Sequence, residues 1–250
     1  MDFDLSEEQS LIKDSVTRLL RTEYGFEARE KHRAGPLGFS ETIWQSFAEL
    51  GLLAIPFSEE DGGLGAGPIE TMIVMEAFGR ALVVEPYLAS VVMAGAALRH
   101  AASPQQRAAI VSGVVDGTSR LAYAFAERGT RYDVSRIAME AKREGEGFRL
   151  AGEKTLVLSG DAATGFVVAA RTAGAPGEAS GLGLFHVPAD AEGLTRRGYP
   201  TQDGMRAADL TFAGVFVPAE AVLGDPEGAA PTLARIEAEA IAALCAEAVG

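Results

Sequence analysis

The sequence predicts an α+β protein in which helices come first, strands follow, and one further helix closes the chain. Apolar residues recur at helical spacing up to about residue 117, and short runs at period two continue to about residue 228. An alanine-rich stretch with helical spacing follows. We therefore expect an N-terminal helical domain over residues 1–117, a β-barrel or sandwich domain over 118–228, and the first helix of an incomplete C-terminal helical domain over 229–250.

The helices of the first part carry recognisable start and stop signals. Ser6 and Gln9 have the spacing of a capping box, and Ser103 followed by proline opens another helix. Between them, Tyr87–Leu98 predicts a very apolar helix. The FSETIWQSFAELG segment predicts a helix that ends at Gly51. Its inward face is expected to consist of Ile43, Trp44, Phe47 and Leu50.

The middle of the chain consists of short alternating runs such as LAYAF, FVVAAR and VFVP, separated by turn residues. In REGEGFRL, Gly145 and Gly147 predict a hairpin turn. The segment LAGEKTLVLSGDA, Leu150–Ala162, is expected to form a second hairpin that turns at its Gly-Glu-Lys sequence. Residues Thr172–Gly181 predict a surface loop between strands.

The last helix presents an apolar stripe without a partner helix after it in the sequence. Such a face is costly to expose, so it must pack on the N-terminal helices or another chain, or the chain continues beyond Gly250. We favour continuation. The stripe consists of Leu233, Ile236, Ala240, Ile241, Leu244 and Ala248.

Composition excludes several classes of protein. The formal net charge of −13 argues against non-specific binding of nucleic acid. No apolar stretch reaches the roughly 20 residues of a membrane helix, and the single Cys245 excludes a disulfide framework. We expect a cytoplasmic protein without membrane insertion. One local concentration of positive charge is interpreted as a solvated strand face: Arg128, Arg131, Arg136, Lys142 and Arg143.

Three features that could indicate a site are better explained structurally. GGLGAG, Gly62–Gly67, lacks the Lys-Ser/Thr of a phosphate loop and joins two helices, so it predicts a turn. Glu127 and Asp133 are flanked by arginines and are expected to be ion-paired surface groups rather than an acid/base dyad. No metal site is predicted, because the histidines lack ligand spacing with Cys245: His32, His100 and His186.

The order of four segments resembles the acyl-CoA dehydrogenase family along essentially the whole chain. They are WQSFAELGLLAIPFSEEDGGLG, AYAFAERGTRYD, LAGEKTLVLSGDA and GMRAADLTFAGVFVPAEAVLG. Within the family, MDFDLSEEQSLIKDSVTRLL, IETMIVMEAFGRALVVEPYLA and RRGYPTQDG are most similar to small subunits of pimeloyl-CoA dehydrogenases.

The resemblance implies FAD as cofactor and an acyl-CoA thioester as substrate. In this family a glutamate removes the α-proton while the β-hydrogen passes as hydride to flavin N5, which gives the trans-2-enoyl-CoA of β-oxidation. The implied partners are a large subunit of the same fold in a heterotetramer, or further copies in a homo-oligomer, and an electron-transfer flavoprotein as electron acceptor.

Six residues align with positions that contact the flavin in the family. Where the family has a Thr-Glu-Pro-x-x-Gly-Ser-Asp strand end, this chain has Ala126 for the threonine. In the Gly-x-Lys-x-Trp-Ile-Thr-Asn-Gly segment, the tryptophan and threonine positions hold Leu156 and Leu158. The ring-stacking and N5-bonding groups are therefore replaced by aliphatic ones. The implied cofactor-binding residues are Tyr123, Phe125, Ala126, Leu156, Leu158 and Ser159.

The resemblance also implies substrate-binding residues but no catalytic base. The helix over Tyr87–Leu98 corresponds to one that lines the acyl tunnel, although core packing explains its small residues equally well. The base position of some members falls on Ala240, and the adjacent Glu239 is expected to point elsewhere, about 100° around the helix. The implied substrate-binding residues are Ser90, Val91, Ala94, Arg131 and Tyr132.

These observations leave three functions open. The first is a subunit of an FAD-dependent acyl-CoA dehydrogenase, with a dicarboxylyl thioester such as pimeloyl-CoA as a candidate substrate. The second is a non-catalytic structural subunit that supports the flavin site of its partner, because the tryptophan and threonine equivalents are absent. A flavin-dependent hydroxylase on the same scaffold is the third.

Overall fold

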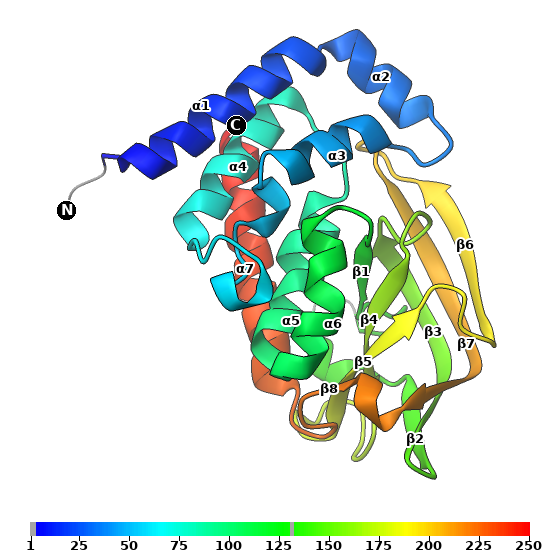
Figure 1. The fold of residues 1–250 in the computed structure, drawn as a ribbon. Helices are drawn as coiled ribbons and strands as arrows, with labels where there is room; N and C mark the ends of the chain where they lie inside the picture. The colour runs from blue at the N-terminus through cyan, green and yellow to red at the C-terminus, as the bar shows by residue number, and fades with distance from the viewer. Residues whose placement is uncertain (1–3, 131–132) are drawn as a thin grey trace.

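The computed structural model describes residues 4–130 and 133–250. Helices gather on one side of the molecule and strands on the other, and the last helix runs among the N-terminal helices (Figure 1). This arrangement confirms the predicted α+β fold. The limits proposed for the three domains stay a prediction. None of the described helices is long and apolar enough to cross a membrane.

The helical part contains six α-helices and a π-helical segment, η3, that continues directly into α5. The predicted capping box of Ser6 is present on α1, and the predicted helix start at Ser103 is a second capping box, on α6. The helices are α1 (Glu7–Glu23), α2 (Phe26–Ala34), α3 (Glu41–Glu49), α4 (Pro68–Ala81), η3 (Leu88–Ala94), α5 (Gly95–Ala101) and α6 (Pro104–Val115). Short 3-10 turns lie at Leu52–Ala54, Glu59–Asp61, Val134–Arg136 and Ala219–Ala221.

The strands form one sheet with the order β6-β7-β3-β2-β4-β5-β8, and β1 pairs in parallel with β4. The predicted hairpin turn joins β2 to β3, with Gly145 in the left-handed region at φ 59°. The strands are β1 (Leu121–Ala124), β2 (Glu140–Glu144), β3 (Gly147–Leu158), β4 (Gly165–Arg171), β5 (Leu182–Pro188), β6 (Leu194–Pro200), β7 (Arg206–Pro218) and β8 (Val222–Leu223).

The prediction of a hairpin in LAGEKTLVLSGDA is wrong. Its first half belongs to the single long strand β3, which pairs with β7 along nearly its whole length. Gly152 has a φ of 143°, a backbone conformation that residues with a side chain rarely adopt, and the strand bends there. A Cβ at this position would also lie only 2.9 Å from Cγ of Met139. Two shifts of register give further curvature, one after Leu150 and one after Lys154.

The closing helix α7 (Ala230–Val249) packs against α4, η3 and α5. Part of its apolar stripe is thereby covered by the N-terminal helices, while Ile241 and Leu244 remain 53% and 46% exposed. Leu50, expected to point inward, is also exposed, because α3 ends at Glu49. Four of the five basic residues singled out between residues 128 and 143 lie in the described part of the chain, and all four are exposed to solvent: Arg128, Arg136, Lys142 and Arg143.

Candidate functional site

Two strand ends bring the predicted cofactor-binding residues together. The first, here called the β1 side, consists of Tyr123, Phe125 and Ala126 at the end of β1. The second, the β3 side, consists of Leu156, Leu158 and Ser159 at the end of β3. The backbone N–H of Thr155 donates to the carbonyl of Ala126 at 2.8 Å, which joins the two sides directly.

The β1 side presents two stacked aromatic rings. The ring centroids of Tyr123 and Phe125 lie 5.0 Å apart at an interplanar angle of 18°. Tyr123 is almost fully buried, and its hydroxyl has no hydrogen-bond partner. Burial, together with the negative charge of Glu237, raises the pKa of Tyr123. The phenol is therefore neutral and leaves one polar atom of the site unsatisfied.

A buried ion pair fixes the β1 side to β3. Lys154 Nζ donates to Glu127 Oε1 at 2.6 Å and to the carbonyl of Phe125 at 3.2 Å. The Glu127 carboxylate also accepts from the backbone N–H groups of Ala138 and Met139. Burial lowers the pKa of Lys154 to about 8, against the opposing effect of Glu127.

The expected roles of Glu127 and Asp133 are only partly right. Both carboxylates are engaged, as expected of structural groups. Glu127, however, pairs with the buried Lys154 instead of a flanking arginine, and Asp133 caps a short turn by accepting from the N–H of Ser135 at 3.0 Å. Lys154 was missed in the sequence as a site residue, although its spacing from Gly152 was part of the family resemblance.

The β3 side contains two residues in a strained backbone conformation. Leu156 and Ser159 have φ of 51° and 54°, in the left-handed region that non-glycine residues rarely occupy. The pairing with β7 passes from Lys154–Leu210 to Val157–Ala208, so that two residues of β3 oppose the single Asp209. This β-bulge leaves the Leu156 side chain 53% exposed. Strain of this kind concentrates at functional sites.

Polar groups from β6 and β7 surround the bulge. The N–H of Leu156 lies 3.2 Å from the Tyr199 hydroxyl and 3.4 Å from Asp209 Oδ1. Tyr199 in turn donates to Asp209 Oδ1 at 3.0 Å, and Arg197 donates to the other carboxylate oxygen at 2.7 Å. These three residues were not among the site residues expected from the sequence, although they lie in segments that carried the family resemblance.

The residues present fit FAD by packing more than by polar contacts. The exposed Leu156 and the half-buried Leu158 and Phe125 offer apolar surface against which a planar ring can pack by dispersion. Neither Ala126 nor Leu158 has a side-chain donor or acceptor. A flavin here would gain ring contacts without the hydroxyl contacts that the family resemblance implies.

The predicted substrate-binding residues on η3 lie in the helical core. Ser90, Val91 and Ala94 are fully buried, and the Ser90 hydroxyl accepts from the N–H of Leu121 at 3.1 Å, which ties η3 to β1. This contact supports the packing interpretation for Ser90, and a role in an acyl tunnel stays a prediction. Arg131 and Tyr132 lie outside the described residues.

An apolar pocket of about 380 Å³ opens between α4, η3, α5 and α7. Glu239 stands at its edge, but Arg99 and His100 of α5 both bind its carboxylate, the latter at 2.6 Å. These hydrogen bonds keep the pKa of Glu239 low against the raising effect of burial. Glu239 is thus held by α5, and its expected orientation away from a flavin stays a prediction. Other lining residues include Pro56, Pro68, Ile69, Met72, Val92 and Ala242.

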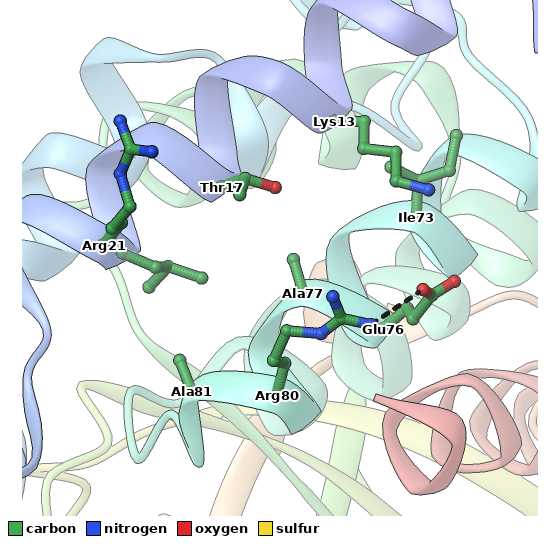
Figure 2. Close-up of a pocket in the computed structure, with 9 residues that line it drawn as sticks. Lys13, Thr17, Arg21, Ile73, Glu76, Ala77, Arg80 and Ala81 are labelled. Carbon is green, nitrogen blue, oxygen red and sulfur yellow. Dashed lines mark ion pairs between the residues drawn. The ribbon is translucent and has the colours of Figure 1, made fainter.

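A second pocket, of about 320 Å³, separates α1 from α4 (Figure 2). Lys13, Thr17 and Arg21 line it from α1, and Glu76 and Arg80 from α4, where the two charged groups are 3.7 Å apart. None of these residues belongs to the β1 or β3 side. Among the described residues, no cluster of three or more histidine, cysteine or acidic side chains could hold a metal ion.

Comparison with known proteins gives matches along most of the chain. The model of the acyl-CoA dehydrogenase N-terminal domain matches residues 6–118, and that of the middle domain matches residues 122–215. The probable acyl-CoA dehydrogenase YngJ of Bacillus subtilis is 27% identical over 231 residues, which are 90% of this chain and 60% of YngJ. The chain therefore spans little more than half the length of such relatives.

Two solved structures of similar shape are complexes by name. The G363A variant of the Tcur3481-Tcur3483 steroid ACAD has a TM-score of 0.83 at 30% identity, covering 96% of this chain and 62% of that one. The ChsE4-ChsE5 complex from Mycobacterium tuberculosis has a TM-score of 0.83 at 26% identity, with the same coverage of 96% and 62%.

Proposed function

This chain belongs to the acyl-CoA dehydrogenase family, and on that premise we propose that it is a subunit of an FAD-dependent acyl-CoA dehydrogenase. One observation carries the proposal. The strained Leu156 follows Thr155, whose N–H bonds the carbonyl of Ala126, so the two segments that face the flavin in the family lie together. Backbone strain of this kind concentrates at functional sites, and an exposed apolar side chain there suits packing against a planar ring.

In the proposed reaction an acyl-CoA is oxidised to the trans-2-enoyl-CoA. Bound FAD supplies the acceptor for the β-hydride. The residues of this chain would pack against the ring, exclude water from it and set its orientation. They would not supply the α-proton acceptor from Glu239, because Arg99 and His100 already hold that carboxylate.

The proposed partner is a larger subunit of the same fold, in a heterotetramer. Two observations support it: Ile241 and Leu244 of α7 are exposed, and the two similar structures are each named after a pair of proteins, one of them as a complex. We further propose a cytoplasmic location, an electron-transfer flavoprotein as electron acceptor, and a substrate class that includes dicarboxylyl thioesters such as pimeloyl-CoA.

A second function is favoured by the same residues. Leu156 and Leu158 lack the stacking and hydrogen-bonding groups expected at their positions. A non-catalytic subunit would retain the fold and support a flavin that is bound by its partner. The two functions differ in which chain touches the ring.

The test isolates the tagged chain from its natural host, with the subunits that accompany it, and records the visible spectrum without oxygen. Flavin bands that bleach on addition of pimeloyl-CoA or a straight-chain acyl-CoA support a dehydrogenase. The subunits are then separated: a yellow chain supports the first function, and a colourless chain beside a yellow partner supports the second. A colourless preparation would overturn both. A flavin that is reduced by NAD(P)H and hydroxylates a substrate would support the third function, the hydroxylase, instead.

A further inference from the structure

The bulge in β3 is held by side chains from two other strands. We propose that Tyr199 and Asp209 are positioning residues, which hold Leu156 in its left-handed conformation and thereby present the β3 side to the flavin. This inference rests on the proposed function, because it assigns the two residues a role at the same site. Neither residue is proposed to touch the reacting atoms.

The bulge explains why Leu156 needs a partner. In a regular antiparallel pair each inward N–H of β3 would donate to a carbonyl of β7, but the extra residue removes Leu156 from that ladder. Its N–H instead donates to the Tyr199 hydroxyl at 3.2 Å and to Asp209 Oδ1 at 3.4 Å. The amide is thus satisfied only while the residue keeps its unusual conformation.

The acceptors are themselves fixed in place. The Tyr199 hydroxyl donates to Asp209 Oδ1 at 3.0 Å, so it can accept from Leu156 with its lone pairs. Arg197 binds the second carboxylate oxygen from the neighbouring strand, and hydrogen bonding to Arg197 lowers the pKa of Asp209. At neutral pH the acceptor is therefore a carboxylate, and hydrogen bonds to charged groups are the stronger kind.

Loss of the acceptors should release the bulge. A leucine in the left-handed region is strained, and this strain persists only where neighbouring groups determine the conformation. Without them, Leu156 gains by returning to an extended conformation. Because successive side chains of a strand point to opposite faces, this change would reorient Leu156 relative to Leu158 and alter the surface offered to the ring.

The experiment compares Tyr199→Phe, Asp209→Ala and Asp209→Asn with the unsubstituted protein. Asp209→Asn keeps an oxygen acceptor and is the conservative variant. Tyr24→Phe is the matched control, because the Tyr24 hydroxyl also bonds a carboxylate, that of Glu85, and a backbone N–H, that of Val84, but in the helical part. Amide hydrogen exchange of residues 153–160 is measured in the flavin-free chain, and FAD affinity and the flavin spectrum in the assembled complex.

We expect exchange of the Leu156 amide to become about five- to tenfold faster in Tyr199→Phe and Asp209→Ala, as for the loss of one net hydrogen bond. FAD affinity of these two variants should fall by a similar factor, and their flavin spectrum should shift. Asp209→Asn should keep most of the FAD affinity that Asp209→Ala loses. Tyr24→Phe should change neither amide exchange nor FAD binding. Unchanged exchange would overturn the proposal.

Faster exchange with unaltered FAD affinity and spectrum would also overturn it, while leaving the proposed function intact. If the unsubstituted complex holds no flavin at all, the proposed function fails and the positioning role fails with it.

Discussion

The β1 side and the β3 side are held by interactions of different kinds. Behind the β1 side lies the pair of Lys154 and Glu127, whose side chains are 0% and 12% exposed. Behind the β3 side lie Tyr199, Asp209 and Arg197, and the Arg197 side chain is 76% exposed. One support is inside the protein and the other is at its surface.

Because of this difference, altering the two supports should have unequal effects on folding stability. A buried ion pair cannot lose one partner without leaving an uncompensated charge inside the protein, so the β1 side is tied to folding. The polar groups behind the bulge are near solvent, and water can replace much of what they lose. We therefore expect substitutions behind the β3 side to cost less stability than substitutions in the ion pair behind the β1 side.

The largest effect is expected for Glu127→Ala. It leaves the Lys154 ammonium buried without its partner and should lower the free energy of unfolding by about 3–5 kcal/mol. Urea denaturation measures the change. Glu153→Ala, one residue before Lys154 on β3 but solvent-exposed, is the control and should have little effect. A loss as small as that of the control would contradict the structural role of the pair.

The pH dependence of stability should carry the signature of Lys154. Its pKa is about 8 in the folded protein against an ordinary value of 10.5, because burial disfavours the charged form. Between these two values the unfolded chain binds more protons than the folded one, so stability rises with pH across this window. Compared with Lys154→Met, the unsubstituted protein should gain stability between pH 7 and pH 10, measured by urea denaturation at each pH. A flat difference would contradict the lowered pKa.

A smaller effect is expected on the β3 side from Leu158→Thr. The added hydroxyl could bond the N5 edge of a flavin and should strengthen FAD binding by about 0.5–1.5 kcal/mol. Leu158→Val is the matched control, because valine has the shape of threonine without the hydroxyl. FAD titration of both variants gives the comparison. Equal affinities would show that position 158 does not face the N5 edge.

The smallest effect should follow Arg197→Ala. Its guanidinium is exposed and binds only one oxygen of Asp209, so its loss should slightly speed amide exchange at Leu156 and hardly alter stability. Raising the salt concentration should remove even this difference, because screening weakens exposed ion pairs. A large loss of stability would contradict the contrast between a buried and a surface support.

Local signals in the sequence predicted much of the fold. Ser6, Ser103 and the Gly145 turn were predicted correctly because each depends on residues within a few positions. The hairpin expected at Leu150–Ala162 was wrong, because Gly152 marks a bend in a strand as readily as a turn. Pairing of β3 with β7 decides between the two, and the residues that pair with Leu150–Leu158 lie between 49 and 65 positions away.

The sequence predicted which two segments form the candidate site, but not the side chains that support them. Resemblance placed Tyr123, Phe125 and Leu156 on two segments, which the structure brings side by side. Tyr199 and Asp209 lie in segments that carried the resemblance, but their contact with Leu156, 43 and 53 residues away, depends on the register of β6 and β7. Supports of this kind follow from sheet register, which one sequence does not reveal.

The central claim is that the β1 and β3 sides of this chain touch the flavin. A crystal structure of the assembled complex with FAD tests it most directly. We predict side-chain atoms of Leu156 and Leu158 within about 4 Å of the isoalloxazine ring, the distance of packed apolar groups. A flavin enclosed by the partner subunit alone, with Leu156 left facing solvent, would contradict the claim.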